Sequence, residues 1–189
     1  MKKLLVFALV AMFASLAMAQ SLQWLGDSYI YHVEEDVWYQ ASGSDVWATG
    51  GAFDSADFGI VGSLTLGAQA QTWEQASGVA VTMFYEVFEG AASVGTGNIG
   101  LAYLDSPGNN DRWENITGVN VAAGLDYSTE YTVAIWLNAT RDGDTTQWDS
   151  NGGNNYVAAF ETQAIPEPAT MSLLGLGALA MVLRRKIRK

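Results

Sequence analysis

Hydrophobic and polar residues alternate with a period of two through the middle of the chain, and this period is typical of β-strands. Residues 79–89 and 131–139 show it most clearly. Both runs also carry apolar or aromatic residues on their second face, which suits central strands. Weaker strands are expected at residues 29–33, 37–41, 58–66, 99–104 and 155–161.

Clusters of Gly, Asn, Asp and Ser separate these runs, as at residues 95–98, 106–110 and 151–155, and such clusters mark turns. No stretch of 12 residues in this region has a clear period of 3.6 with capping residues. Seven or eight strands at this spacing predict an all-β fold. We expect a single antiparallel β-sandwich, jelly-roll or immunoglobulin-like, with a barrel as the alternative.

Composition and charge narrow the class of protein. The chain has 189 residues and no Cys, which excludes a disulfide framework and a cysteine-ligated metal site. Its formal net charge is −11, with the basic residues concentrated at the two ends. Residues 20–164 hold 19 acidic residues against Arg112 and Arg141, a net charge of −17. A phosphate backbone would repel this region, so the charge argues against a nucleic-acid partner.

The first residues have the pattern of a secretory signal peptide. Lys2 and Lys3 form a charged start, residues 4–16 are nearly all apolar, and Ala17 to Ala19 offer an A-x-A cleavage site. We therefore predict a signal peptide at residues 1–19, with the Sec translocon and signal peptidase as partners and residues 20–164 as the extracytoplasmic domain. The alternative is an uncleaved membrane anchor.

The last residues, 165–189, contain the most specific motif. Pro166, Glu167 and Pro168 precede an apolar stretch, and two prolines around one residue hold the backbone extended. Residues 169–183 would span about 22 Å as a helix against a hydrocarbon core of about 30 Å, which predicts a marginal transmembrane helix. A basic tail follows, which should stay cytoplasmic: Arg184, Arg185, Lys186, Arg188 and Lys189.

This combination resembles a PEP-CTERM sorting segment. The resemblance implies that exosortase, a membrane-embedded cysteine protease or transpeptidase-like enzyme, recognises Pro166, Glu167 and Pro168. The apolar helix would then be a transient anchor and the basic tail a retention signal. Ile165 stands where the family usually has Val. The resemblance also implies a Gram-negative-type bacterium, an intermediate anchored in the inner membrane, and delivery to the cell surface or extracellular matrix. The alternative is an ordinary C-terminal anchor.

Aromatic residues suggest a sugar-binding site. Trp136, Tyr85, Tyr131 and Phe160 are expected in the core. Two other tryptophans lie in polar surroundings where an exposed ring could face the apolar side of a sugar while Asn and Asp bind its hydroxyls. Residues 148–156 also resemble the terminal pattern of starch-binding β-sandwich modules of families 25 and 26. The candidate carbohydrate-binding residues are Trp113, Trp148, Asp149, Asn151, Asn154 and Tyr156.

Metal binding and catalysis have weaker support. Asp142, Asp144 and Asp149 supply hard oxygen ligands in one loop and make a calcium candidate, although the spacing is not that of an EF-hand and such loops are usually only solvated. No other cofactor is expected. His32 is the one histidine and lies in a predicted strand. The consecutive acids Glu34 to Asp36 suit a solvated turn, so no catalytic residue is predicted.

These observations predict an exported envelope or extracellular-matrix protein sorted by exosortase. We expect it to be non-catalytic, with a structural or adhesive role alongside extracellular polysaccharide. The alternatives are a carbohydrate-binding module, a glycoside-active enzyme that uses surface tryptophans and paired carboxylates, and a self-assembling surface subunit.

Overall fold

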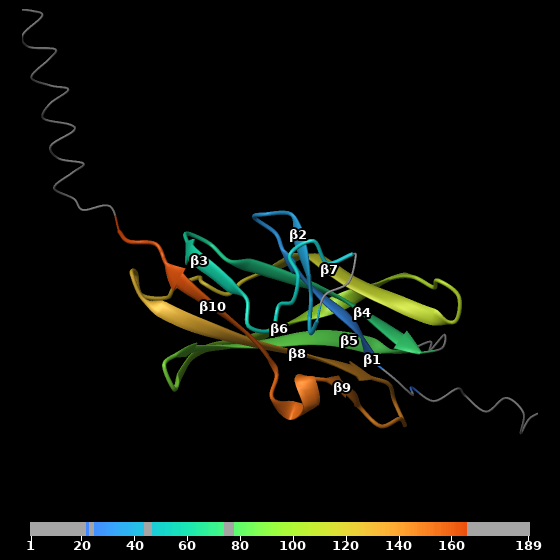
Figure 1. Ribbon diagram of the computed structural model, residues 1–189. Coiled ribbons are helices and arrows are strands. Elements are labelled where there is room, and N and C mark those ends of the chain that lie inside the picture. The colour runs from blue at the N-terminus through green and yellow to red at the C-terminus, as the bar shows by residue number, and fades with distance from the viewer. Residues whose placement is uncertain (1–21, 23–24, 44–46, 74–77, 166–189) are drawn as a thin grey trace, which may run out of the picture.

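The computed structural model describes residues 22, 25–43, 47–73 and 78–165, and this part of the chain folds into ten β-strands (Figure 1). A short 3₁₀ turn, η1 (Asn151–Gly153), joins the last two strands. In chain order the strands are β1 (Leu25–His32), β2 (Val37–Gln40), β3 (Asp57–Val61), β4 (Thr65–Trp73), β5 (Ala80–Glu89), β6 (Ala92–Asp105), β7 (Asn110–Asn120), β8 (Glu130–Thr140), β9 (Gln147–Asp149) and β10 (Tyr156–Thr162).

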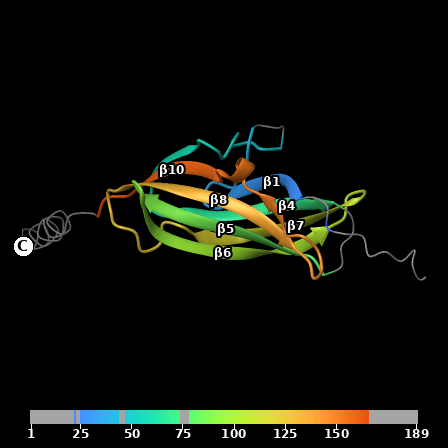
Figure 2. The same cartoon turned by 90° about the horizontal axis from the view of Figure 1, so that it is seen from below.

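The strands form one continuous sheet in the order β2-β1-β4-β7-β6-β5-β8-β10-β3, with β9 beside β8. The sheet turns back on itself at β6. The part of β6 from Ala92 to Leu101 pairs with β5, and the part from Ala102 to Asp105 pairs with β7. The result is two facing layers: a first layer of β1, β2, β4 and β7, and a second layer of β3, β5, β8, β9 and β10 (Figures 1 and 2).

The all-β prediction is confirmed, and the two layers face each other as in a sandwich. The architecture differs from a sandwich of two separate antiparallel sheets, because the 14-residue β6 belongs to both layers and joins them. The sheet is also mixed. Strands β3 and β10 run parallel, whereas the other named pairs run antiparallel.

Side chains from both layers meet in one core. Ile30 and Leu66 from the first layer and Met83, Ile135 and Leu137 from the second are fully buried and belong to the same cluster. Burying one such side chain stabilises the fold by about 1.5–3 kcal/mol. Because successive residues of a strand point to opposite faces, the neighbours of these residues form the two outer faces of the sandwich.

This alternation decides which aromatic residues are buried. Tyr131 and Phe160 lie in the core as expected, with ring centroids 5.6 Å apart. The expectation for Trp136 is wrong. Its neighbours on β8 point inward, so Trp136 lies half-buried on the outer face and stacks on Phe84 of β5 at 5.7 Å and 7°. The second layer therefore has an aromatic outer face.

The predicted turns and strand boundaries are partly wrong. The Gly-rich residues 95–98 lie inside β6 instead of in a turn. There Gly97 pairs with Tyr85, which packs partly buried against the core, and a Cβ at Gly97 would lie 2.5 Å from Tyr85 Oη. Glycine here makes room for a ring on the next strand. Residues 58–66, expected as one strand, are divided between β3 and β4.

Candidate functional site

The stretch that resembles starch-binding modules, residues 148–156, forms a closed structural connection between β9 and β10. Tyr156 is buried and its hydroxyl donates a hydrogen bond to Asp149. Burial, reinforced by this hydrogen bond, raises the pKa of Tyr156. The Asn151 amide donates to Asp54 Oδ2 at 3.2 Å and to the carbonyl of Asn155 at 3.3 Å. These polar groups therefore hold the connection together instead of facing an open site.

Two of the candidate carbohydrate-binding residues in the same stretch do face the solvent. Asn154 is exposed, and Trp148 is 55% exposed on the outer face of the second layer. The Trp148 ring lies 6.4 Å from that of Phe84, which in turn stacks on Trp136. Trp148 is thus the end of an aromatic cluster in which the rings contact one another.

The expectation that Trp113 lies at the surface is wrong. Trp113 belongs to β7, which is not among the strands expected from the sequence, and its ring points into the core with 8% exposure. It pairs with the small Ala70 of β4, and its indole Nε1 donates to Thr72 Oγ1 at 3.0 Å. A ring held in this way presents no face to a ligand, so Trp113 is a structural residue.

The structure does not bring the calcium candidates together. The Asp144 carboxylate accepts a hydrogen bond from the Leu22 backbone N–H at 2.9 Å and lies 3.6 Å from Arg141 Nε. Asp149 is held by the tyrosine described above, and Asp142 is exposed. Within the described residues, no group of three His, Cys, Asp or Glu side chains could hold a metal ion.

His32 lies at the end of β1, as expected for a strand residue, and is buried. Its Nε2 lies 3.4 Å from Glu34 Oε2 and its Nδ1 lies 3.3 Å from Glu35 Oε2. The ring also contacts that of Phe58 edge to face at 5.2 Å. These contacts give His32 a packing role beneath the turn that follows β1.

The turn itself is more ordered than a solvated acidic loop. The Glu34 carboxylate accepts hydrogen bonds from Ser63 Oγ at 2.6 Å, from Thr65 Oγ1 at 2.6 Å and from the Thr65 backbone N–H at 2.8 Å. Partial burial alone would raise the pKa of Glu34, but these hydrogen bonds outweigh it and lower the pKa to about 2. Glu34 therefore ties the β1–β2 turn to the start of β4.

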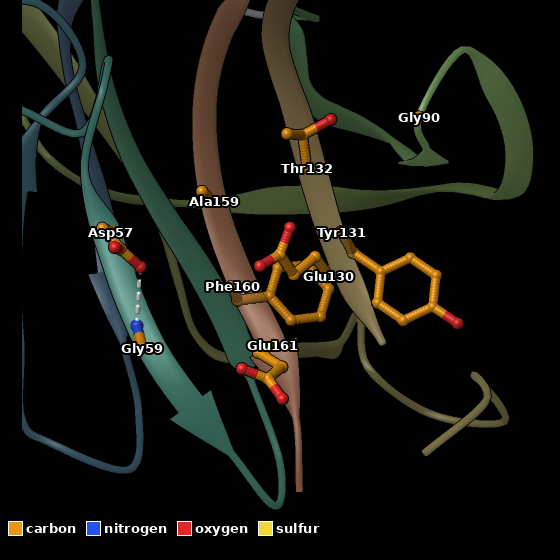
Figure 3. A pocket seen from close by; sticks show the side chains of 9 residues that line it. All are labelled: Asp57, Gly59, Gly90, Glu130, Tyr131, Thr132, Ala159, Phe160 and Glu161. Atoms are coloured by element: carbon orange, nitrogen blue, oxygen red, sulfur yellow. Dashed lines mark hydrogen bonds between the residues drawn. The ribbon is translucent and has the colours of Figure 1, made fainter. Parts of the chain in front are cut away.

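A recess of about 460 Å³ lies at the end of the second layer, between β3, β8 and β10 (Figure 3). Three carboxylates line it: Asp57, Glu130 and Glu161. Glu130 and Glu161 are direct partners on neighbouring strands, while Asp57 accepts a hydrogen bond from the Gly59 backbone N–H at 2.8 Å. Like charges directly opposite each other disfavour the pairing of β8 with β10 at this position. Because its three acidic side chains are carboxylates, the recess is part of the acidic surface of the domain.

A second hollow of about 330 Å³ lies on the outer face of the first layer and has different chemistry. We call it the aromatic groove. None of its residues is among the site residues predicted from the sequence. Three aromatic and four polar side chains line it: Tyr29, Trp38, Trp47, Gln69, Gln71, Arg112 and Glu114.

Strand register builds the polar floor of the aromatic groove. Tyr29, Gln69 and Glu114 pair across β1, β4 and β7 in one row, and Gln71 pairs with Arg112 in the next. All point away from the core because their neighbours in the chain point into it. Gln69 Nε2 donates to Glu114 Oε2 at 2.9 Å, which fixes the orientation of both side chains.

The other polar groups of the floor are also held in place. Gln71 Oε1 accepts a hydrogen bond from Asn110 Nδ2 at 3.2 Å. Arg112 makes a two-fold contact with Asp105, with Nε donating to Oδ1 at 2.6 Å. The hydrogen bond from Arg112 lowers the pKa of Asp105, and the same contact raises the pKa of Arg112. The guanidinium is therefore neutralised by a partner next to the groove.

Aromatic rings border this floor. Trp38 of β2 packs against Tyr31 of β1, with centroids 4.7 Å apart and the planes inclined by 32°. Trp47, in the loop after β2, is 77% exposed. The groove thus offers tryptophan and tyrosine rings beside amide, carboxylate and guanidinium groups.

Comparison with known families gives a match at the C-terminal end of the chain. Residues 164–186 match the model of the PEP-CTERM protein-sorting motif. The chain carries a PEP-CTERM sorting motif. This confirms the resemblance on which the sorting prediction rests, and it implies an exported protein that exosortase processes at the membrane. No curated protein matches the chain.

The PEP-CTERM motif includes Pro166, Glu167 and Pro168, which lie outside the described residues, as do the predicted signal peptide, apolar helix and basic tail. In the described part of the chain, no helix is long and apolar enough to cross a membrane. Proteins with a PEP-CTERM motif are generally non-catalytic surface proteins.

Proposed function

We propose that this protein is exported by the Sec route, sorted by exosortase and released into the extracellular polysaccharide matrix of a Gram-negative-type envelope, where it has a non-catalytic structural or adhesive role. The observation that carries the proposal is the PEP-CTERM motif at residues 164–186. The folded part before it supplies a compact β-domain with one shared core.

Charge supports a matrix role. Between residues 20 and 164 the net charge is −17, which keeps the protein soluble. This charge by itself would repel anionic polymers, so binding to them requires a cation between the two. Divalent cations gathered by such a surface would link it to anionic polysaccharide. The three carboxylates of the recess in Figure 3 lie at one end of this surface.

The sorting step is tested by comparing cells with and without exosortase. In normal cells we expect the mature protein to lack the basic tail, and in cells without exosortase we expect an intact Lys189 terminus in the membrane fraction. Glu167→Gln and Pro168→Ala should reproduce the second result. Ile165→Val is the matched control and should be processed normally. Identical mass and location in both strains would refute the proposal.

A further inference from the structure

We propose that the aromatic groove binds a neutral oligosaccharide, and that this contact attaches the domain to its matrix. The inference rests on the proposed function for its setting, and on the groove itself for its chemistry. Three rings and four polar side chains converge on one hollow of about 330 Å³, within the size range of small-ligand sites.

The residue types of the groove fit the two kinds of surface on a sugar. A pyranose has apolar C–H faces that pack on aromatic rings and a rim of hydroxyls that need hydrogen-bond partners. Trp47, at 77% exposure, and Trp38 supply rings, and Gln69 and Gln71 supply amides. Each amide has two N–H donors and an oxygen acceptor, so the bond that each makes to another described side chain leaves capacity for hydroxyls.

The groove is arranged before any ligand arrives. Hydrogen bonds orient Gln69 on Glu114 and Gln71 on Asn110, and the Tyr31 ring supports Trp38. Side chains already held in one orientation lose less conformational entropy on binding, which favours affinity for a weakly binding ligand such as a sugar.

Electrostatics favours an uncharged sugar over an acidic one. Arg112 is the one basic residue among the described residues that line the groove, and Asp105 neutralises it. Glu114 adds a negative charge, and the surrounding domain carries −17. A uronate, sulfate or phosphate group would therefore meet net repulsion here.

A proline-rich peptide is the main competing ligand, because such peptides also dock in aromatic grooves. The floor favours the sugar. Its described residues are two amides, a carboxylate and a guanidinium, and none of these is an aliphatic side chain that would pack against a proline ring. A hydroxyl-rich ligand satisfies this floor better.

The test uses the full chain in a detergent without a sugar headgroup, since a glycoside detergent would compete for the groove. The probes are an array of neutral and acidic oligosaccharides and a proline-rich peptide. We expect binding to neutral oligosaccharides that weakens about tenfold or more in Trp47→Ala and Gln71→Ala. Trp148→Ala, an exposed tryptophan on the opposite outer face, is the matched control and should bind within about twofold of the parent.

Three results would overturn the proposal: no saccharide binding, binding of acidic sugars or the peptide alone, or loss of binding in Trp148→Ala with Trp47→Ala unaffected. A near-ultraviolet circular dichroism spectrum shows that each variant is folded. Sorting is read separately from the mature mass. Normal processing without sugar binding would refute the groove alone, and sugar binding without processing would refute the sorting proposal alone.

Discussion

On the outer face of the first layer, Trp38 and Trp47 border a hollow with an amide floor, whereas on the outer face of the second layer Trp136 stacks on Phe84 and Trp148 lies against the same ring. Both faces are aromatic, and amides pair with rings on the second face too, Asn98 with Phe84 and Asn138 with Trp148. In the groove, hydrogen bonds to Glu114 and Asn110 orient the amides, and rings and amides line one hollow. Exposed tryptophan alone therefore does not distinguish a binding site from a packed surface. The polar groups around the ring do.

The two faces share one core, and removing part of it should damage both. Ile135→Ala leaves a cavity beneath both layers, and we expect a loss of about 2–5 kcal/mol in the free energy of unfolding. Urea denaturation measures this loss. Ile60→Ala, at a site that is 68% exposed, is the control and should change stability by less than about 0.5 kcal/mol. Equal effects would mean that Ile135 does not pack between the layers.

Trp113 packs inside the first layer, so its replacement should destabilise that layer. Trp113→Phe removes the indole N–H that bonds to Thr72 and part of the buried ring, and we expect a loss of about 1–3 kcal/mol. A double-mutant cycle with Thr72→Val measures the coupling between the two residues. Fully additive losses would contradict the hydrogen bond.

The sequence predicted the central strands but not the groove, for a physical reason. Strands β5 and β8 carry aliphatic residues at alternate positions, so burial can be recognised locally. Strand β7 turns Asp111 and Trp113 inward between polar neighbours, and the buried Asp111 accepts a hydrogen bond from Ser106. A buried carboxylate among polar neighbours breaks the alternation of apolar and polar residues, so the sequence pattern did not predict β7.

The sorting motif could be recognised in the sequence, whereas the groove could not. The motif is contiguous, and its prolines, apolar stretch and basic tail can be identified in one stretch of sequence. The groove draws residues from β1, β2, β4 and β7 and from the loop after β2, between Tyr29 and Glu114. Register across the strands brings them together, and register depends on pairings between distant segments. The tryptophans in polar surroundings suggested a sugar-binding site, and the structure was needed to find the residues of the aromatic groove.

Acid should weaken the first layer through Glu34, which ties its β1–β2 turn to β4. The folded pKa of about 2 lies below the ordinary value of 4.5, so the stabilisation is complete above pH 4.5 and is lost as the pH falls toward 2. Since the side chain is 34% exposed, solvent screening limits the effect to about 1–2 kcal/mol.

Unfolding curves from pH 6 to pH 2 test this prediction. Glu34→Gln should remove this part of the pH dependence. Glu35→Gln, a more exposed neighbouring carboxylate at 57%, should leave it in place. A parent protein with the same pH dependence as Glu34→Gln would contradict the role of the three hydrogen bonds.

The smallest effect we expect separates the two faces most directly. Trp148→Ala removes a ring that contacts Phe84 and should cost about 0.5–1.5 kcal/mol, whereas Trp47→Ala, at 77% exposure, should cost less than about 0.5 kcal/mol. Sugar affinity should show the opposite order. The Trp148 ring contributes to stability through its contact with Phe84, whereas most of the surface of Trp47 is exposed and can contact a ligand. If the same variant were the more damaging in both measurements, the distinction between the faces would be wrong.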